Sequence, residues 1–150
     1  MARKRVKDVL FIKPILILSI LGLLFSGYLT FTKIFSGVCA FNEPCPYFLG
    51  YPACIYGFGL YLLLFSFSLV LIMNKPEYDP KFIMKTIGII SGIGVLFAGY
   101  MTFLEITSPA GILGSGYALI LPTCVYGAIM YILILLLAIL SLKGKRKILG

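Results

Sequence analysis

Four long apolar runs dominate the pattern along this chain of 150 residues. They span residues 14–35, 52–73, 82–104 and 122–142, and each reaches the roughly 20 residues that a helix needs to cross about 30 Å of hydrocarbon. Polar residues gather between the runs and at both ends of the chain. The pattern predicts an all-α integral membrane protein, a bundle of four transmembrane helices forming a single domain over residues 1–150.

The first and third runs share a sequence, and so do the second and fourth. Residues 19–31 (SILGLLFSGYLTF) align without gaps on residues 91–103 (SGIGVLFAGYMTF). The segment PACIYG at 52–57 recurs as PTCVYG at 122–127. These matches indicate an internal repeat in which each copy is one helical hairpin.

The two expected hairpins cover about 14–73 and 82–142. A unit of two helices returns the chain to its starting side of the membrane, so both copies should have the same orientation. We therefore expect the hairpins to be related by a pseudo-twofold axis along the membrane normal.

Basic residues set the expected topology. Lys and Arg cluster before the first run, in the Asn74–Lys85 loop and after the fourth run. By the positive-inside rule both termini and this loop are cytoplasmic, whereas loops 33–51 and 105–121 face outward. We expect a multi-pass protein of the cell membrane with all four cysteines on the extracytoplasmic side. The net charge of +8 requires no nucleic-acid partner, because topology signals and attraction to anionic membrane lipid account for it.

Small residues recur at helical spacing in the first and third runs. Such a stripe lets helix backbones approach closely in lipid, so we expect it to serve packing. A ligand groove lined by the same residues is the alternative. The stripe consists of Ser19, Gly22, Ser26, Ser91, Gly94 and Ala98.

Cys54 and Cys124 occupy the same slot in the two copies, each two positions after a proline at the start of a helix. The N–H groups and positive dipole end of a first turn favour a thiolate, which is the reactive form of cysteine. The alternative is a small neutral thiol packed at the end of the bundle. The repeated frame and outward location keep reactive thiol chemistry open.

Cys39 and Cys45 lie in the first outward loop, which also contains Pro44. A disulfide between them is sterically feasible, and an extracytoplasmic location favours oxidation. Such a bond could be a structural staple, or the pair could pass electrons by thiol–disulfide exchange. The four cysteines allow three complete connectivities, and the sequence does not choose among them.

The absence of histidine excludes a histidine-ligated metal and a Ser-His-Asp triad. Cys54 and Cys124 also lack the close spacing of structural zinc ligands, so no metal is expected. Tyr61 and Tyr131 follow these cysteines by seven positions and share their helix face. A phenol there could donate a hydrogen bond to a quinone carbonyl, whereas an interfacial aromatic belt is the plainer explanation for tyrosine.

Over most of residues 14–142 the chain resembles the vitamin K epoxide reductase family and the analogous bacterial disulfide-forming membrane oxidases. The resemblance lies in four helices, two loop cysteines after the first helix, Gly50 and Pro52 before the second, and a cysteine at the outer start of the fourth. Members relay electrons from a loop cysteine pair to a Cys-x-x-Cys beside a quinone. The resemblance implies that Cys39 and Cys45 are the loop pair.

The chain departs from the family at helix four, where Gly127 replaces the second cysteine expected after Cys124. The resemblance also aligns Tyr131 with a tyrosine that members commonly have near the quinone. We expect Cys54 to supply the missing thiol if the outer ends of helices two and four come within the roughly 4.4–6.8 Å Cα separation of a disulfide.

The leading hypothesis is a membrane thiol–disulfide oxidoreductase that takes electrons from a separate extracytoplasmic thioredoxin-like protein and delivers them to a quinone. Its site would comprise Cys39, Cys45, Cys54 and Cys124, with Tyr61 and Tyr131 near the quinone. The alternative is a non-catalytic four-helix protein whose disulfides are structural and which binds a partner protein or lipid. A transporter is the weakest option, because no acid or base falls at the centre of a span.

Overall fold

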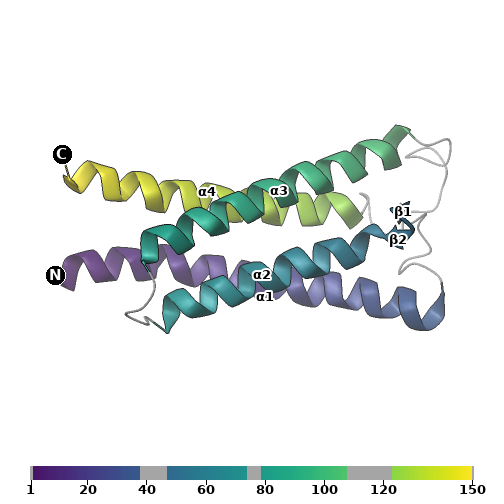
Figure 1. The fold of residues 1–150 in the computed structure, drawn as a ribbon, viewed down its shortest axis with the longest axis horizontal. Helices are drawn as coiled ribbons and strands as arrows, with labels where there is room; N and C mark the ends of the chain where they lie inside the picture. The colour runs from purple at the N-terminus through teal and green to yellow at the C-terminus, as the bar shows by residue number, and fades with distance from the viewer. Residues whose placement is uncertain (1, 38–46, 74–78, 108–122, 150) are drawn as a thin grey trace.

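The computed structural model describes residues 2–37, 47–73, 79–107 and 123–149. Four long helices run side by side and give the molecule an elongated shape, with both chain ends at the same end of the bundle (Figure 1). They are α1 (Ala2–Ser36), α2 (Ala53–Ile72), α3 (Pro80–Thr107) and α4 (Thr123–Leu149).

Each of the four helices contains a segment long and apolar enough to cross a membrane: Phe11–Ser36, Ala53–Ile72, Pro80–Thr107 and Thr123–Lys143. This confirms the predicted all-α architecture, with four helices among the described residues that are long and apolar enough to span a membrane. Large apolar side chains on the outer faces of the helices are exposed, as expected for a surface in contact with lipid tails.

Two helices begin earlier than the apolar runs indicated. Helix α1 starts at Ala2 and continues through Pro14, since the Lys and Arg residues near its start are good helix formers. The apolar run begins later because hydropathy marks only the lipid-crossing part of a helix. Helix α3 starts at Pro80, where the preceding Asp79 accepts a hydrogen bond from the Lys81 backbone N–H at 3.0 Å. Proline suits this first helical position, since the missing N–H would have had no helical acceptor.

The helices pack in a cyclic order. Helix α1 packs against α2 and α4, and α3 packs against α4 and α2, so α2 and α4 lie diagonally across the bundle. The core along its axis draws on corresponding positions of the two sequence repeats. It includes Ile15 with Ile87, Tyr61 with Tyr131, and Leu64 with Ile134.

A short antiparallel hairpin precedes α2, which the sequence pattern had not indicated. Its strands are β1 (Tyr47–Phe48) and β2 (Tyr51–Pro52), and its turn uses Leu49 and Gly50 at positive φ. The hairpin lies at the end of the bundle opposite the chain ends (Figure 1).

The hairpin packs against the bundle through an aromatic cluster. The ring of Phe48 lies 5.6 Å from the rings of both Tyr56 and Phe97, edge to face in each case. The Tyr56 hydroxyl also donates a hydrogen bond to the Phe48 carbonyl at 3.2 Å. Phe97 thereby connects α3 to the segment that enters α2.

Candidate functional site: a pocket with two cysteines and a tyrosine pair

A pocket of about 60 Å³ lies between the four helices, near the starts of α2 and α4. Its walls are almost entirely apolar, and the described residues that line it carry no charged side chain. Each helix contributes to the lining. The lining residues are Phe25, Ser26, Leu29, Ala53, Cys54, Gly57, Tyr61, Phe97, Ala98, Met101, Thr123, Cys124, Gly127 and Tyr131.

The lining consists of matched positions from the two sequence repeats. No lining residue lacks its counterpart, and four of the pairs are identical in residue type. The other three pairs differ: Ser26 matches Ala98, Leu29 matches Met101, and Ala53 matches Thr123. The identical pairs are Phe25 with Phe97, Cys54 with Cys124, Gly57 with Gly127, and Tyr61 with Tyr131.

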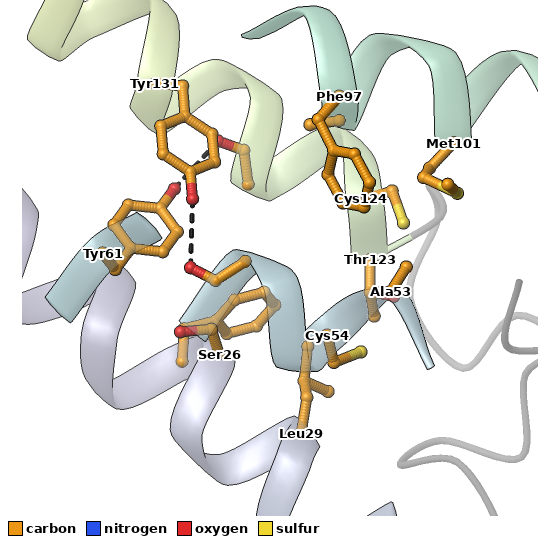
Figure 2. Close-up of a pocket in the computed structure, with 14 residues that line it drawn as sticks. Ser26, Leu29, Ala53, Cys54, Tyr61, Phe97, Met101, Thr123, Cys124 and Tyr131 are labelled. Atoms are coloured by element: carbon orange, nitrogen blue, oxygen red, sulfur yellow. Dashed lines mark hydrogen bonds between the residues drawn. The ribbon is translucent and has the colours of Figure 1, made fainter. Parts of the chain in front are cut away.

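Tyr61 and Tyr131 form the inner end of the pocket, where their rings stack with centroids 4.3 Å apart and planes inclined by 14°. The Tyr61 hydroxyl donates to the Gly127 carbonyl at 3.0 Å, and the Tyr131 hydroxyl donates to the Gly57 carbonyl at 3.1 Å. Each side chain is only 2% exposed. The pair therefore ties α2 to α4 across the bundle by two reciprocal hydrogen bonds (Figure 2).

Two glycines make room for these rings. A Cβ atom added at Gly22 would overlap the Tyr61 ring, and one added at Gly94 would overlap the Tyr131 ring. Both glycines belong to the small-residue stripe of α1 and α3. At these two positions the stripe serves packing, as expected, whereas Ser26 and Ala98 of the same stripe line the pocket.

Cys54 and Cys124 lie in the first turns of α2 and α4, and both thiols line the pocket with half-buried side chains. The residue before α2, Pro52, makes no side-chain capping hydrogen bond to the first-turn N–H groups. Figure 2 shows the two cysteines and Met101 toward the opposite end of the pocket from the tyrosine pair. The structure thus brings Cys54, Cys124, Tyr61 and Tyr131 to one site.

Cys39 and Cys45 lie outside the described residues. In the sequence Cys45 precedes β1 by two positions, and β1 carries Phe48, which packs against the pocket residue Phe97. The hairpin therefore connects the cysteine-bearing loop to the pocket wall.

Several site residues were not identified from the sequence as functional. They are the carbonyl groups of Gly57 and Gly127, the aromatic walls Phe25 and Phe97, and the thioether Met101. The signal that could have found the two glycines was present, because both belong to the repeated Pro-x-Cys-x-Tyr-Gly frame. The role of the Gly57 and Gly127 carbonyls as acceptors becomes clear only from the diagonal placement of α2 and α4.

Comparison with known proteins adds no relative. No family model matches the chain, and neither the curated proteins nor the solved structures include a significant match.

Proposed function

We propose that this protein is a membrane thiol–disulfide oxidoreductase of the vitamin K epoxide reductase type, with Cys54 and Cys124 as its inner redox couple. One observation carries the proposal: two cysteines far apart in the sequence line the same apolar pocket, each in the first turn of a helix. A helix N-terminus favours the thiolate that exchange reactions require.

The proposed membrane topology follows from the positions of the Lys and Arg residues. Both termini and the Asn74–Lys85 loop are cytoplasmic, so the pocket end of the bundle faces the extracytoplasmic side of the cell membrane. The two hairpins share this orientation and are related by a pseudo-twofold axis. The matched pocket residues and the reciprocal tyrosine hydrogen bonds support that relation.

In the proposed cycle, the loop disulfide Cys39–Cys45 oxidises a dithiol in a separate extracytoplasmic thioredoxin-like protein. A thiolate of that partner attacks one loop sulfur, its second thiolate resolves the mixed disulfide, and Cys39 and Cys45 leave as thiols. The same exchange with an oxidised Cys54–Cys124 couple restores the loop disulfide. Two electrons thus reach the pocket in each cycle.

The oxidised inner couple requires the first turns of α2 and α4 to approach one another, since a disulfide needs a Cα separation of about 4.4–6.8 Å. The tyrosine links hold Gly57 and Gly127, which lie one turn further along each helix. These links hold α2 and α4 together close to the cysteine-bearing turns.

We propose that a quinone ring lies against the pocket walls, which are apolar and include Phe25, Phe97 and the tyrosine pair beside the two thiols. A bound quinone would supply the acceptor for two electrons and two protons. The hydroxyls of Tyr61 and Tyr131 already donate to backbone carbonyls, so their part is to shape the inner end of the pocket.

The proposal is tested by turnover. The purified protein in lipid nanodiscs should reduce a soluble quinone analogue in the presence of a reduced thioredoxin-like protein, followed by the absorbance of the quinone. Cys54→Ser and Cys124→Ser should each lower the rate by at least about 1000-fold, as expected when a covalent redox group is removed. Tyr100→Phe, at a tyrosine that is 52% exposed, is the matched control and should retain full activity.

The alternative is a non-catalytic bundle with structural disulfides. It predicts that the wild-type protein reduces no quinone and that serine replacements lower thermal stability alone. Quinone reduction that is equal in wild type, Cys54→Ser and Cys124→Ser would also contradict the proposal.

A further inference from the structure

Three sulfur atoms line the pocket: the thiols of Cys54 and Cys124 and the thioether of Met101. Met101 is fully buried in α3. Figure 2 shows all three residues toward one end of the pocket, away from the stacked tyrosines. Cysteine and methionine are the soft ligands that select monovalent copper.

The remaining lining residues offer little to a hard cation. Apart from the hydroxyls of Ser26, Thr123 and the two tyrosines, the non-sulfur side chains that line the pocket are apolar. Within the part of the chain that the structure describes, no group of three or more His, Cys, Asp or Glu side chains is positioned to hold a metal. The pocket therefore offers too few ligands for zinc, which takes four in structural sites. Its sulfur ligands suit a soft ion of low coordination number.

Cys54 and Cys124 lie on α2 and α4, which are diagonal in the bundle, and the separation expected between these helices suits an ion that bridges the two thiols. Packed neighbouring helices lie about 8–10 Å apart, so axes on a diagonal lie roughly 12 Å apart. With Cα atoms about 2.3 Å from each axis, inward-facing Cα atoms on α2 and α4 would lie roughly 7 Å apart. Two metal–sulfur bonds of about 2.3 Å each would bridge the thiols at that separation, whereas the disulfide of the proposed redox cycle needs the two first turns to approach further.

Charge also favours such an ion. Two thiolates and one Cu(I) ion form a complex of net charge −1, which would be costly in an apolar pocket without compensation. Cys54 and Cys124 lie in the first turns of two helices, and the positive ends of both helix dipoles compensate that charge. Two equivalent thiols, one from each repeat, suit an ion placed midway between them.

We propose that the reduced protein binds one Cu(I) ion between Cys54 and Cys124, with Met101 as a third, weaker ligand. The two thiols lose two protons on binding and no electron is transferred, so the metal stays Cu(I) throughout. The inference goes beyond the proposed oxidoreductase activity, because it needs neither quinone nor a thioredoxin-like partner. Bound Cu(I) would also block oxidation of the same thiols.

The test is anaerobic competition for Cu(I) between bicinchoninate and the reduced full-length protein in nanodiscs. Cys39→Ser/Cys45→Ser serves as the background, so that only the two pocket cysteines remain. This protein should withdraw one equivalent of Cu(I) from the coloured bicinchoninate complex. Adding Cys54→Ser or Cys124→Ser should weaken Cu(I) binding by more than about 100-fold. Loss of a residue that only supports a metal ligand costs up to about 100-fold, and loss of the ligand itself should cost more.

The thioether is tested by moving it. Met101→Leu should weaken Cu(I) binding about tenfold, within the range expected for a supporting ligand. Adding Leu29→Met places a thioether at the matched position of the other repeat, and should recover most of that loss. A Met101→Leu protein with unchanged affinity would overturn the role given to Met101.

A measurement on unaltered side chains guards against misfolded variants. In the wild-type protein, one equivalent of Cu(I) should protect Cys54 and Cys124 from maleimide alkylation, and excess Zn²⁺ should not. Alkylation that proceeds equally with and without Cu(I), or withdrawal of no Cu(I) by the background protein, would overturn the proposal. Neither result bears on quinone reduction, which is measured separately.

Discussion

Tyr61 and Tyr131 stack at 4.3 Å and each donates its hydroxyl to a carbonyl on the other's helix, one to Gly127 and one to Gly57. One tyrosine and one glycine from each repeat therefore meet between α2 and α4. This tyrosine pair separates the packed inner core from the pocket that holds Cys54 and Cys124.

Removing either hydroxyl should weaken the link between α2 and α4. We expect Tyr61→Phe and Tyr131→Phe each to lower the free energy of unfolding by about 1 kcal/mol, the usual net value of one such hydrogen bond. The two losses should be similar, because the bonds are reciprocal and similar in length. Unfolding in mixed detergent micelles measures both, with the exposed Tyr100→Phe as the control. Losses equal to that of the control would contradict the role given to the pair.

The glycines beneath the rings should tolerate no side chain. Gly94→Ala places a methyl group against the Tyr131 ring and should lower the free energy of unfolding by about 1–3 kcal/mol, as overpacking does. Gly22→Ala should behave alike through Tyr61.

Gly92→Ala, on the same helix as Gly94, is the matched control, since an added Cβ meets nothing within 4 Å there. It should leave stability unchanged or raise it by up to about 1 kcal/mol through better helix propensity. Equal losses at Gly92 and Gly94 would mean that the close approach of the Tyr131 ring is not the cause.

Phe97 should hold the hairpin in place, whereas its repeat counterpart Phe25 should not. Phe97 packs against Phe48 and Tyr56, while Phe25 meets only the more distant Tyr126 ring, at 6.5 Å, among the ring contacts of the described residues. Phe97→Leu should speed hydrogen exchange of the hairpin amides about tenfold, since an aromatic pair contributes about 0.5–1.5 kcal/mol beyond its buried area. Phe25→Leu should leave that exchange unchanged. Hydrogen exchange followed by mass spectrometry distinguishes the two variants.

The four membrane helices could be predicted because apolar length alone decides them, and the repeat indicated which residues would correspond. The heptad spacing from Cys54 to Tyr61 and from Cys124 to Tyr131 correctly indicated that each pair shares a helix face, since all four side chains line one pocket. The acceptors of the tyrosine hydroxyls could not be predicted. They are backbone carbonyls on a diagonal helix, and only the packing order of the bundle brings them within reach.

The hairpin at 47–52 was missed for a related reason. Two-residue strands carry no alternation of polar and apolar residues. Their stability comes from Phe48 packing against Tyr56 and against Phe97, which is far away in the sequence. The start of α1 at Ala2 was missed because hydropathy detects the lipid-crossing part of a helix and not its polar extension.

The central claim is that Cys54 and Cys124 form a working redox couple. It is tested most directly by trapping the protein in acid, with and without added quinone, and mapping each cysteine by differential alkylation and mass spectrometry. We expect a bond joining Cys54 to Cys124, or a loop cysteine to one of them, whose occupancy rises with quinone and falls with a reduced thiol partner. Cysteines whose state is the same under every condition, whether fully oxidised or fully reduced, would contradict the claim.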